Sequence, residues 1–245
     1  LGDVYKRQDR NIVLKVIYYY WKQKVSQGAL CKYHILKSNI ESTCNICLTN
    51  MDLNEKIKMV EEIKKAAKLI ESSTFFHFVM PQVNTNLVYA SSNARTINDI
   101  LAFPGRLVKI RNIVKSIGEP EFGASKHIAS MLLLAHLKNS QIKSCICIKF
   151  DDEILKILKL LNLKIDFNFP KNRKDPDPVV KAFKRFLELK NVPDVLIDKG
   201  GYGLEPVCYI FGKNPIQVAS IALKIAERYS VNKIYREEKE GLPLF

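Results

Sequence analysis

The chain has 245 residues, a formal net charge of +14 and 47% hydrophobic residues. This length allows one large domain or two small ones, and the apolar fraction is sufficient for a packed core. The sequence has no apolar run of 18 residues and no visible secretory signal, so we expect a cytoplasmic protein without a membrane partner. The positive charge favours phosphorylated small molecules or nucleic acid as partners, although solvated lysine-rich helices would produce the same excess.

The first part of the chain contains two pairs of candidate metal ligands. Residues 1–8 match nothing that follows, and we interpret them as a cloning or assembly scar. Residues 9–52 form a head with four spaced ligands: Cys31, His34, Cys44 and Cys47. Two chelating pairs of this kind fit a tetrahedral structural zinc site, and disulfides are not expected in a cytosolic chain. The alternative is a set of ordinary side chains that bind no metal.

Residues 53–73 have the pattern of an amphipathic helix. Apolar residues recur at steps of three and four, namely Ile57, Val60, Ile63, Ala67 and Ile70. Glu and Lys alternate on the opposite face, which is typical of a solvated surface. We therefore expect a helix that links the head to the rest of the chain.

From residue 74 onward, the sequence alternates between strand-like and helix-like segments. We predict strands at residues 76–90, 142–150, 165–169, 195–198 and 207–212, and a hairpin of residues 106–110 and 113–117. We predict helices at residues 96–102, 128–137, 151–161, 179–189 and 215–229. Such an order indicates an α/β domain over residues 74–232 with some antiparallel pairing, followed by a tail at residues 233–245.

The segment Pro120–His127 has the features of an anion-binding loop. It contains Gly123 and two small residues directly before an apolar run that begins at Ile128. Free N–H groups at a helix N-terminus attract anions, and glycine lets the backbone approach a ligand closely. Nearby polar and cationic side chains would add contacts, namely Ser125, Lys126, His127 and Arg106. The residues alone fit a phosphate site and an ordinary solvent-facing helix start about equally.

Five motifs together resemble the ThiN family, the archaeal-type thiamine-phosphate synthase domain. They are Val83–Ala90 with Asn86, Pro104-Gly105-Arg106, Glu119–His127, Asp194-Val195 and Asp198–Pro206. The resemblance extends from about residue 74 to residue 230. It implies a three-layer α/β/α domain with a mixed sheet, of the type seen in class II aldolase-like folds.

The resemblance also implies a reaction and a set of site residues. Family enzymes join hydroxymethylpyrimidine diphosphate to hydroxyethylthiazole phosphate, which gives thiamine phosphate and pyrophosphate, and we expect Mg²⁺ to be needed if the chain is active. Arg106 and His127 match the family's functional arginine and histidine. The implied substrate-binding residues are Asn86, Gly105, Gly123, Ala124, Ser125, Lys126, Asp198, Gly203 and Glu205.

The head and one loop favour a different use of the same domain. The Cys/His head is similar to the linker of archaeal regulators that fuse a helix-turn-helix to a ThiN domain, and residues 171–178 are basic and lack the family's Trp-Gly turn. Our first hypothesis is therefore the sensory part of a thiamine-responsive transcription regulator, which would contact DNA only through a missing N-terminal segment. The alternative is a thiamine-phosphate synthase. In either case we expect thiamine phosphate or its precursors as ligands, and a homodimer.

Overall fold

The computed structural model describes residues 53–170, 177–201 and 203–240. The chain divides into two units, residues 1–57 and 58–245, and the fold below is that of the second unit. The predicted zinc ligands, from Cys31 to Cys47, lie outside the described residues. The predicted linker helix is present as α3, Leu53–Glu71.

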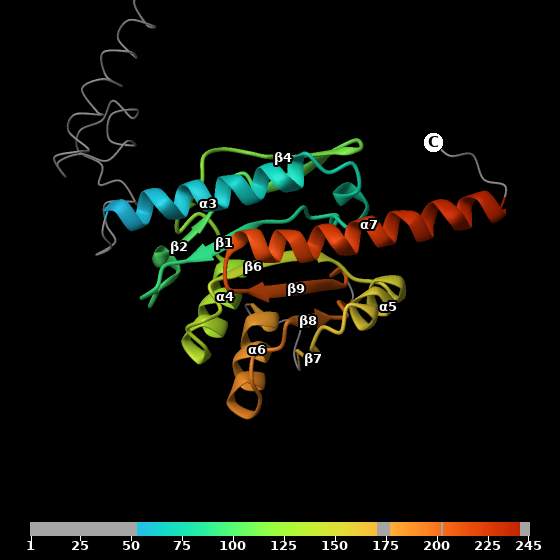
Figure 1. Ribbon diagram of the computed structural model, residues 1–245. Helices are drawn as coiled ribbons and strands as arrows, with labels where there is room; N and C mark the ends of the chain where they lie inside the picture. Colours follow the sequence, from blue (N-terminus) through green and yellow to red (C-terminus); the bar gives the residue numbers. More distant parts are fainter. Residues whose placement is uncertain (1–52, 171–176, 202, 241–245) are drawn as a thin grey trace, which may run out of the picture. The chain divides into compact units, whose positions relative to one another are not determined.

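A seven-stranded sheet forms the centre of the second unit (Figure 1). Its strands in spatial order are β5 (Glu121–Phe122), β2 (Ile100–Ala102), β1 (Leu87–Ala90), β6 (Ser144–Lys149), β9 (Val207–Gly212), β8 (Val195–Asp198) and β7 (Ile165–Asn168). All neighbouring strands are antiparallel except β7 and β8, which are parallel. The predicted α/β class is thus confirmed, with a central sheet that is mostly antiparallel.

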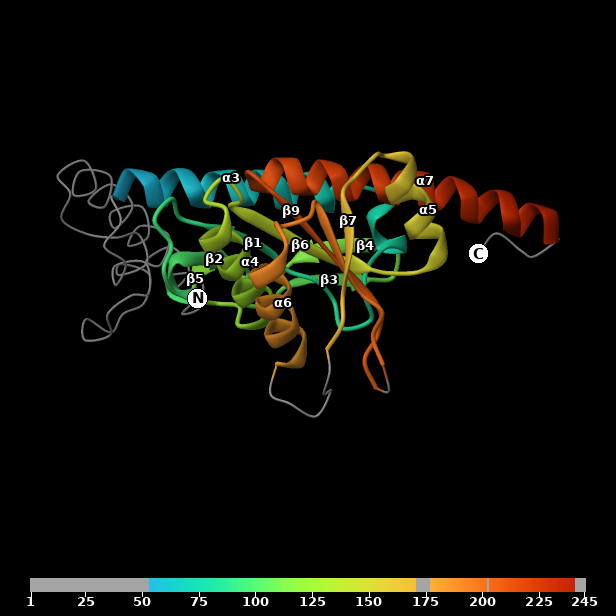
Figure 2. The ribbon, with the colours of Figure 1, turned by 90° about the horizontal axis from the view of Figure 1, so that it is seen from below.

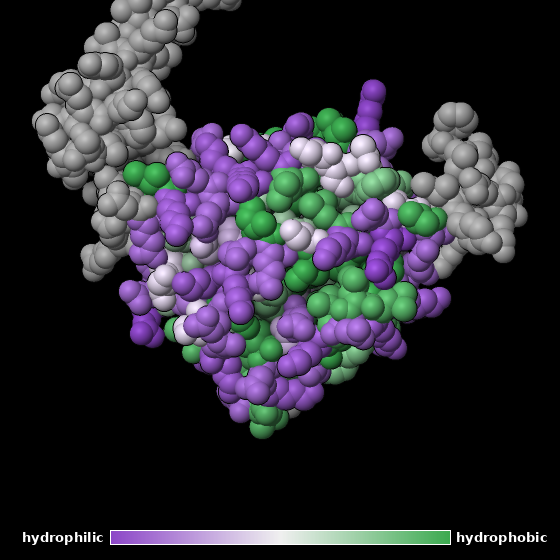
Figure 3. All heavy atoms as spheres, viewed as in Figure 1, coloured by the Kyte–Doolittle hydropathy of each residue, from purple (hydrophilic) through white to green (hydrophobic). Residues whose placement is uncertain are grey.

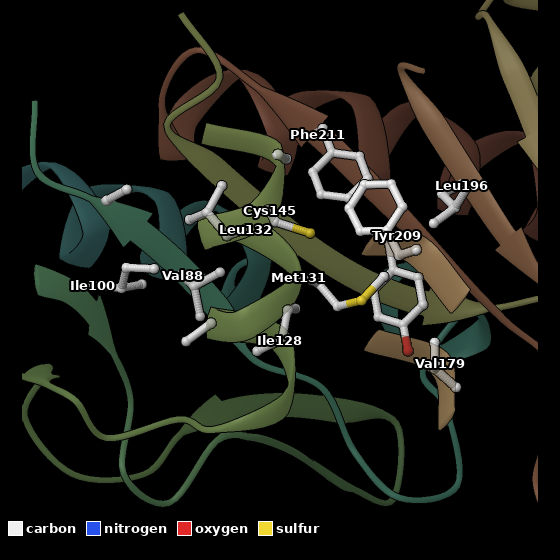
Figure 4. Packing of buried hydrophobic residues seen from close by; sticks show 14 of the residues in the cluster. Val88, Ile100, Ile128, Met131, Leu132, Cys145, Val179, Leu196, Tyr209 and Phe211 are labelled. Atoms are coloured by element: carbon white, nitrogen blue, oxygen red, sulfur yellow. The ribbon is translucent and has the colours of Figure 1, made fainter. Parts of the chain in front are cut away.

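Helices α4 (His127–Lys138) and α6 (Pro178–Leu189) pack on one face of this sheet. Alternate strand residues such as Val88, Cys145 and Tyr209 point toward them, as the two-residue period of a strand requires. Figure 4 shows Met131 and Leu132 of α4 above these strand side chains. Because the cluster is almost fully closed to water, it supplies a large part of the hydrophobic stabilisation.

Helix α7 (Pro215–Glu240) packs against the central strands β1, β6 and β9, and α5 (Asp152–Leu160) packs against α7. The intervening strand residues, including Leu87, Ile146 and Ile210, are fully buried. Buried Ala and Ile residues of α7 provide the matching surface: Ala219, Ala222, Ile225 and Ala226. Small side chains at these positions allow a long helix to approach the sheet closely.

A separate two-stranded sheet lies beside the last turns of α3. It is the predicted hairpin, formed by β3 (Leu107–Ile110) and β4 (Ile113–Ser116). The Glu71 carboxylate of α3 accepts hydrogen bonds from the backbone N–H of Ser116 at 2.9 Å and from its hydroxyl at 2.5 Å. Lys64 and Glu119 form an ion pair of 2.5 Å further along α3. The hairpin is therefore held by polar contacts as well as by the buried Leu107 and Val114.

Two predicted elements differ in the structure. The strand predicted at residues 76–90 is reduced to its last four residues, preceded by a 3₁₀ helix at Phe76–Phe78 and a turn in which the N–H of Asn84 donates to Pro81. The helix predicted at residues 96–102 is a single 3₁₀ turn, Ile97–Asp99, with a capping box between Thr96 and Asp99. It ends after one turn because the next three residues are all buried in β2.

Helix α7 is longer than predicted. It continues past Tyr229 to Glu240, so part of the predicted tail from residue 233 is helical. No glycine or proline interrupts the sequence between Pro215 and Glu240, and Gly241 follows directly. The lysine and glutamate residues of this last part are good helix formers, and they gave no apolar period from which the helix could be predicted.

The surface of the second unit is mainly hydrophilic on the face viewed in Figure 1, with smaller hydrophobic areas between the charged side chains (Figure 3). Among the described residues, no helix is both long and apolar enough to cross a membrane.

The packing of α6 can be tested with two alanine substitutions on the same helix. Phe183 is fully buried and stacks on Phe211 with a centroid distance of 5.5 Å, whereas Leu189 is 89% exposed. Phe183→Ala is expected to lower the free energy of unfolding by about 3–5 kcal/mol through lost contacts and a cavity. Leu189→Ala is expected to change it by less than about 0.5 kcal/mol. Chemical denaturation measures both, and equal losses would contradict the assigned face of α6.

Candidate active site

The candidate site lies at the carboxyl ends of the only parallel strand pair among the described residues. In the β7–β8 register, Asn168 lies opposite Asp198, and each is the last residue of its strand. The start of α6 lies at the same end of the sheet (Figure 2). Ligands of α/β proteins commonly bind beyond the carboxyl ends of parallel strands, because side chains and loops converge there.

His127 enters this site from the first position of α4. Its Nε2 atom lies 2.7 Å from the hydroxyl oxygen of Tyr209, which comes from the central strand β9. Its Nδ1 atom lies 3.9 Å from the carboxylate of Asp177, directly before α6. In Figure 4 the Tyr209 hydroxyl points away from Phe211, at the open end of the cluster near Val179. The ring is therefore held on one side, while the imidazole itself is about half-exposed.

The charge state of His127 is set by opposing effects. Partial burial places the pKa of His127 below its ordinary value of 6.5, because it disfavours the imidazolium. Asp177 and Asp198 oppose this decrease in the pKa, whereas the positive charge of Arg106 adds to it. Near neutral pH the ligand-free protein thus holds a neutral imidazole within electrostatic range of one cation and two carboxylates.

Arg106 is presented by a tight turn. The N–H of Arg106 donates to the carbonyl of Phe103 at 3.1 Å, and Arg106 has a left-handed backbone with φ of 64°. A side chain on Gly105 would collide with Ile117, since its Cβ would lie 2.4 Å from that residue's Cγ2 atom. The sequence Pro104-Gly105-Arg106 therefore encodes the turn, and a left-handed non-glycine residue at its end is typical of functional sites.

The guanidinium of Arg106 and the carboxylate of Glu205 hold one exposed turn between them. Glu205 accepts hydrogen bonds from the backbone N–H groups of Gln82 and Val83 at 2.8 and 2.9 Å. Arg106 donates from one guanidinium nitrogen to the carbonyl of Val83 at 2.7 Å. Such charge-assisted bonds are the stronger kind, so this turn has a well-defined position. We refer to Glu205, Arg106 and the bonded Gln82-Val83 backbone as the Val83 clamp.

Asn86 holds the residue from which the Arg106 turn begins. Its amide oxygen accepts from the N–H of Phe103 at 3.1 Å, and its amide nitrogen donates to the carbonyl of Phe103 at 2.7 Å. Asn86 is buried, and both of its polar atoms are occupied by these bonds. The structure thus places this predicted substrate-binding residue in a supporting position, where it fixes the start of the arginine turn.

The predicted anion-binding loop is a loop followed by a helix, as expected, but its glycine has a structural task. Gly123 has a left-handed backbone with φ of 75°, and its N–H donates to the carbonyl of Ile100 at 3.0 Å. Ala124 packs against the core cluster, whereas Lys126 is exposed at the N-cap position and its side chain caps no amide. Helix α4 therefore begins without a side-chain cap, and its first turn starts at His127.

Asp198 and the glycines that follow it shape the backbone directly after β8. Asp198 is buried, and its carboxylate accepts from the N–H of Gly200 at 2.9 Å. Gly200 has a φ of 69°, and a Cβ there would lie 2.4 Å from the carbonyl oxygen of Leu204. Gly203 also has a positive φ, but its surroundings are open. Gly200 is required because a side chain there would collide with the neighbouring backbone. Gly203 is required only by its backbone conformation.

Sequence reasoning missed Tyr209, Asp177 and Asn168. Tyr209 stands 82 positions after His127, so their contact depends on the strand order. Asn168 is buried, and its amide oxygen has no partner among the described residues. Burial raises the pKa of the nearby Cys147 thiol, and the charges of Glu205 and Asp198 add to the increase, which disfavours the nucleophilic thiolate. Asn168 and Tyr209 carried only the signal of a strand position, and Asp177 only that of a position directly before a helix.

Comparison with known proteins supports the resemblance. The family model for thiamine-phosphate synthase ThiN matches residues 62–224. The chain is 29% identical over 184 residues to thiamine-phosphate synthase ThiN of Methanothermobacter thermautotrophicus, which covers 71% of this chain and 95% of the relative. It is also 29% identical over 181 residues to the bifunctional thiamine biosynthesis protein ThiDN of Methanocaldococcus jannaschii, which covers 71% of this chain and 42% of that protein.

Solved structures show the same relationship. The C-terminal domain of protein MJ0236 matches 72% of this chain and 97% of its own length, with a TM-score of 0.63 and 27% identity. The C-terminal domain of phosphomethylpyrimidine kinase matches 71% of this chain and all of its own length, with a TM-score of 0.59 and 31% identity. Because the family model covers more than half of the chain and the folds agree, this protein belongs to the ThiN family.

Proposed function

We propose that this chain is a thiamine-phosphate synthase, which joins hydroxymethylpyrimidine diphosphate to hydroxyethylthiazole phosphate and releases pyrophosphate. The observation that carries the proposal is that His127, at the uncapped start of α4, lies within electrostatic range of Arg106 and of Asp198, the last residue of β8. Several donors and one cation in one place suit a reaction in which a diphosphate departs.

In the proposed reaction, the bond between the pyrimidine methylene carbon and the diphosphate breaks, and the thiazole nitrogen forms a bond to that carbon. The departing diphosphate carries the electron pair, so the site must stabilise its growing negative charge. The exposed guanidinium of Arg106 is a permanent cation with further donors besides the one bonded to Val83. The N-terminus of α4 contributes its dipole and its first N–H groups.

His127 has a role that follows from its lowered pKa. A neutral imidazole next to the Tyr209 hydroxyl can donate one hydrogen bond to a phosphate oxygen, and it becomes protonated when a phosphate raises its pKa. Tyr209 positions the ring through Nε2, which leaves the Nδ1 side toward Asp177. His127 therefore acts as a hydrogen-bond donor and proton acceptor that responds to the arrival of the anion.

We propose that a magnesium ion would be held mainly by the phosphates of the substrate, with Asp177 or Asp198 as the protein carboxylate. No cluster of three or more His, Cys, Asp or Glu side chains suited to a metal occurs in the described part of the chain. Mg²⁺ commonly needs one or two carboxylates besides substrate phosphates and water, and Asp177 and Asp198 are the carboxylates that act on His127. When bound, the ion would supply additional charge neutralisation at the diphosphate.

The matched relatives favour the synthase over the transcription regulator that was our first hypothesis. Their names describe thiamine-phosphate synthesis and thiamine biosynthesis. A helix-turn-helix, a zinc-binding head and a homodimer stay predictions, and the first two concern residues outside those that the structure describes.

Removal of either proposed catalytic side chain should abolish most of the synthase activity. Arg106→Ala is expected to lower kcat/KM by about 10²–10³-fold because a charge-stabilising donor is lost, and His127→Asn by about 10²-fold or more. Thiamine phosphate formation with both phosphorylated precursors and Mg²⁺ measures this loss. The exposed Arg185→Ala on α6 is the matched control and should keep full activity. Equal activity of Arg106→Ala and Arg185→Ala would exclude the proposed role of Arg106.

Ligand binding should be coupled to proton uptake by His127. In the free protein the pKa of His127 lies below 6.5, and a bound phosphate is expected to raise this pKa. Between the two pKa values the complex holds one proton more than the free protein, so the affinity for thiamine phosphate should rise as the pH falls toward 6.

Calorimetry in buffers of different ionisation enthalpy measures this proton uptake. Thiamine phosphate itself titrates in this range, and His127→Asn removes only the contribution of the protein. The same proton uptake in the wild type and in His127→Asn would show that His127 does not face the phosphate.

The Val83 clamp should support both stability and activity. Glu205→Gln replaces one accepting oxygen by an NH₂ group that cannot accept from the backbone N–H it faces, so one hydrogen bond is lost and the other is no longer charge-assisted. We expect a decrease of about 1–3 kcal/mol in the free energy of unfolding and a lower kcat/KM, because Arg106 loses its fixed partner. Glu188→Gln, at an exposed position of α6, is the control. An unchanged stability relative to this control would mean that Glu205 does not hold the turn in solution.

A further inference from the structure

Val83 combines exposure with a fixed backbone. It is 61% exposed, although single exposed apolar residues are common on protein surfaces and need no explanation by themselves. What distinguishes Val83 is that its N–H bonds to Glu205 and its carbonyl to Arg106. The clamp thus holds an apolar side chain in water beside the cation of the site.

A second exposed apolar residue adjoins the Val83 clamp. Leu204 is 44% exposed and directly precedes Glu205. Its N–H and carbonyl bond to the carbonyl and N–H of Gly201 at 2.9 and 3.0 Å. Two apolar side chains on fixed backbone therefore flank the carboxylate that forms the clamp.

We infer that Val83 is a specificity-determining residue that contacts the aromatic ring of a phosphorylated heterocycle whose phosphate binds Arg106. The guanidinium lies 2.7 Å from the carbonyl oxygen of Val83, so the cation and the apolar side chain belong to adjacent groups. A phosphorylated heterocycle of this kind has an apolar ring joined to its phosphate by one or two methylene groups. The inference rests on the proposed function, and both phosphorylated precursors have this chemistry.

The alternative, that Val83 is an ordinary surface valine, has a matched control in the same chain. Val231 on α7 is 59% exposed, nearly the same as Val83. Truncation of either valine to alanine removes the same two methyl groups, and the clamp uses only backbone atoms of Val83. If Val83→Ala weakens ligand binding and Val231→Ala does not, the location of the Val83 side chain, and not its exposure, is responsible.

Steady-state kinetics with one precursor varied and the other saturating tests the inference. Val83→Ala is expected to raise KM about tenfold for the precursor whose ring it contacts and to leave kcat within about twofold, because an apolar contact is lost in ground and transition state alike. The two series identify that precursor, Val231→Ala should leave both KM values unchanged, and Val83→Ile should retain the wild-type KM. Unchanged KM values for both precursors in Val83→Ala overturn the inference.

A binding measurement keeps this test separate from the proposed activity. If the wild type forms no product, the proposed synthase activity fails, and calorimetry with thiamine phosphate then compares the same variants. A roughly tenfold weaker affinity of Val83→Ala supports the ring contact in a binding protein. Equal affinities of Val83→Ala and Val231→Ala, or no binding by the wild type, overturn it.

Discussion

The position of Arg106 depends on hydrogen bonds that tie three loops to one another. Asn86 uses both ends of its amide to hold Phe103, from which the arginine turn begins. Glu205 and Arg106 then hold the Gln82-Val83 backbone from two sides. Most of these bonds involve a charged group or a buried amide, for which the loss of one partner is costly. These bonds and the left-handed backbone of Arg106 together favour one position of the arginine turn.

The sheet connects this loop assembly to His127. The histidine begins α4, which packs on the sheet over the same core cluster that contains the body of Tyr209. The tyrosine ring is buried, and its hydroxyl reaches the histidine at the edge of the cluster. Core packing thus sets the direction of the imidazole, while partial burial lowers its pKa. The core cluster under α4 therefore determines both the stability of the site and its electrostatics.

The sequence predicted those parts of the fold that depend on local chemistry. The strands at residues 195–198 and 207–212 have the predicted bounds because each is a short apolar run with a clear end, the first at a glycine-containing loop and the second at Gly212 before the Pro215 helix start. The predicted hairpin and most helices are present for similar reasons. The segment predicted as a helix at residues 96–102 forms one 3₁₀ turn and then a strand near the edge of the sheet, because burial in the sheet overrides helical preference.

The motifs of the site could be predicted from the sequence, but the contacts between its residues could not. Pro104-Gly105-Arg106 and the loop before His127 could be singled out because glycine and cationic residues mark turns and anion sites. The roles of Asn86, Gly123 and Glu205 could not, since their partners Phe103, Ile100 and Val83 are fixed by tertiary pairing. These residues shape the site through the backbone, whereas a sequence motif by itself suggests direct contact with a ligand.

The proposed activity is bond formation between two phosphorylated heterocycles. A single-turnover experiment, with protein in excess over hydroxymethylpyrimidine diphosphate and with saturating thiazole phosphate and Mg²⁺, tests this activity directly. We expect thiamine phosphate and pyrophosphate in equal amounts, with formation of both dependent on the thiazole phosphate. Tight binding of thiamine phosphate without any pyrophosphate release under these conditions would contradict it and would identify the site as a sensor of the product.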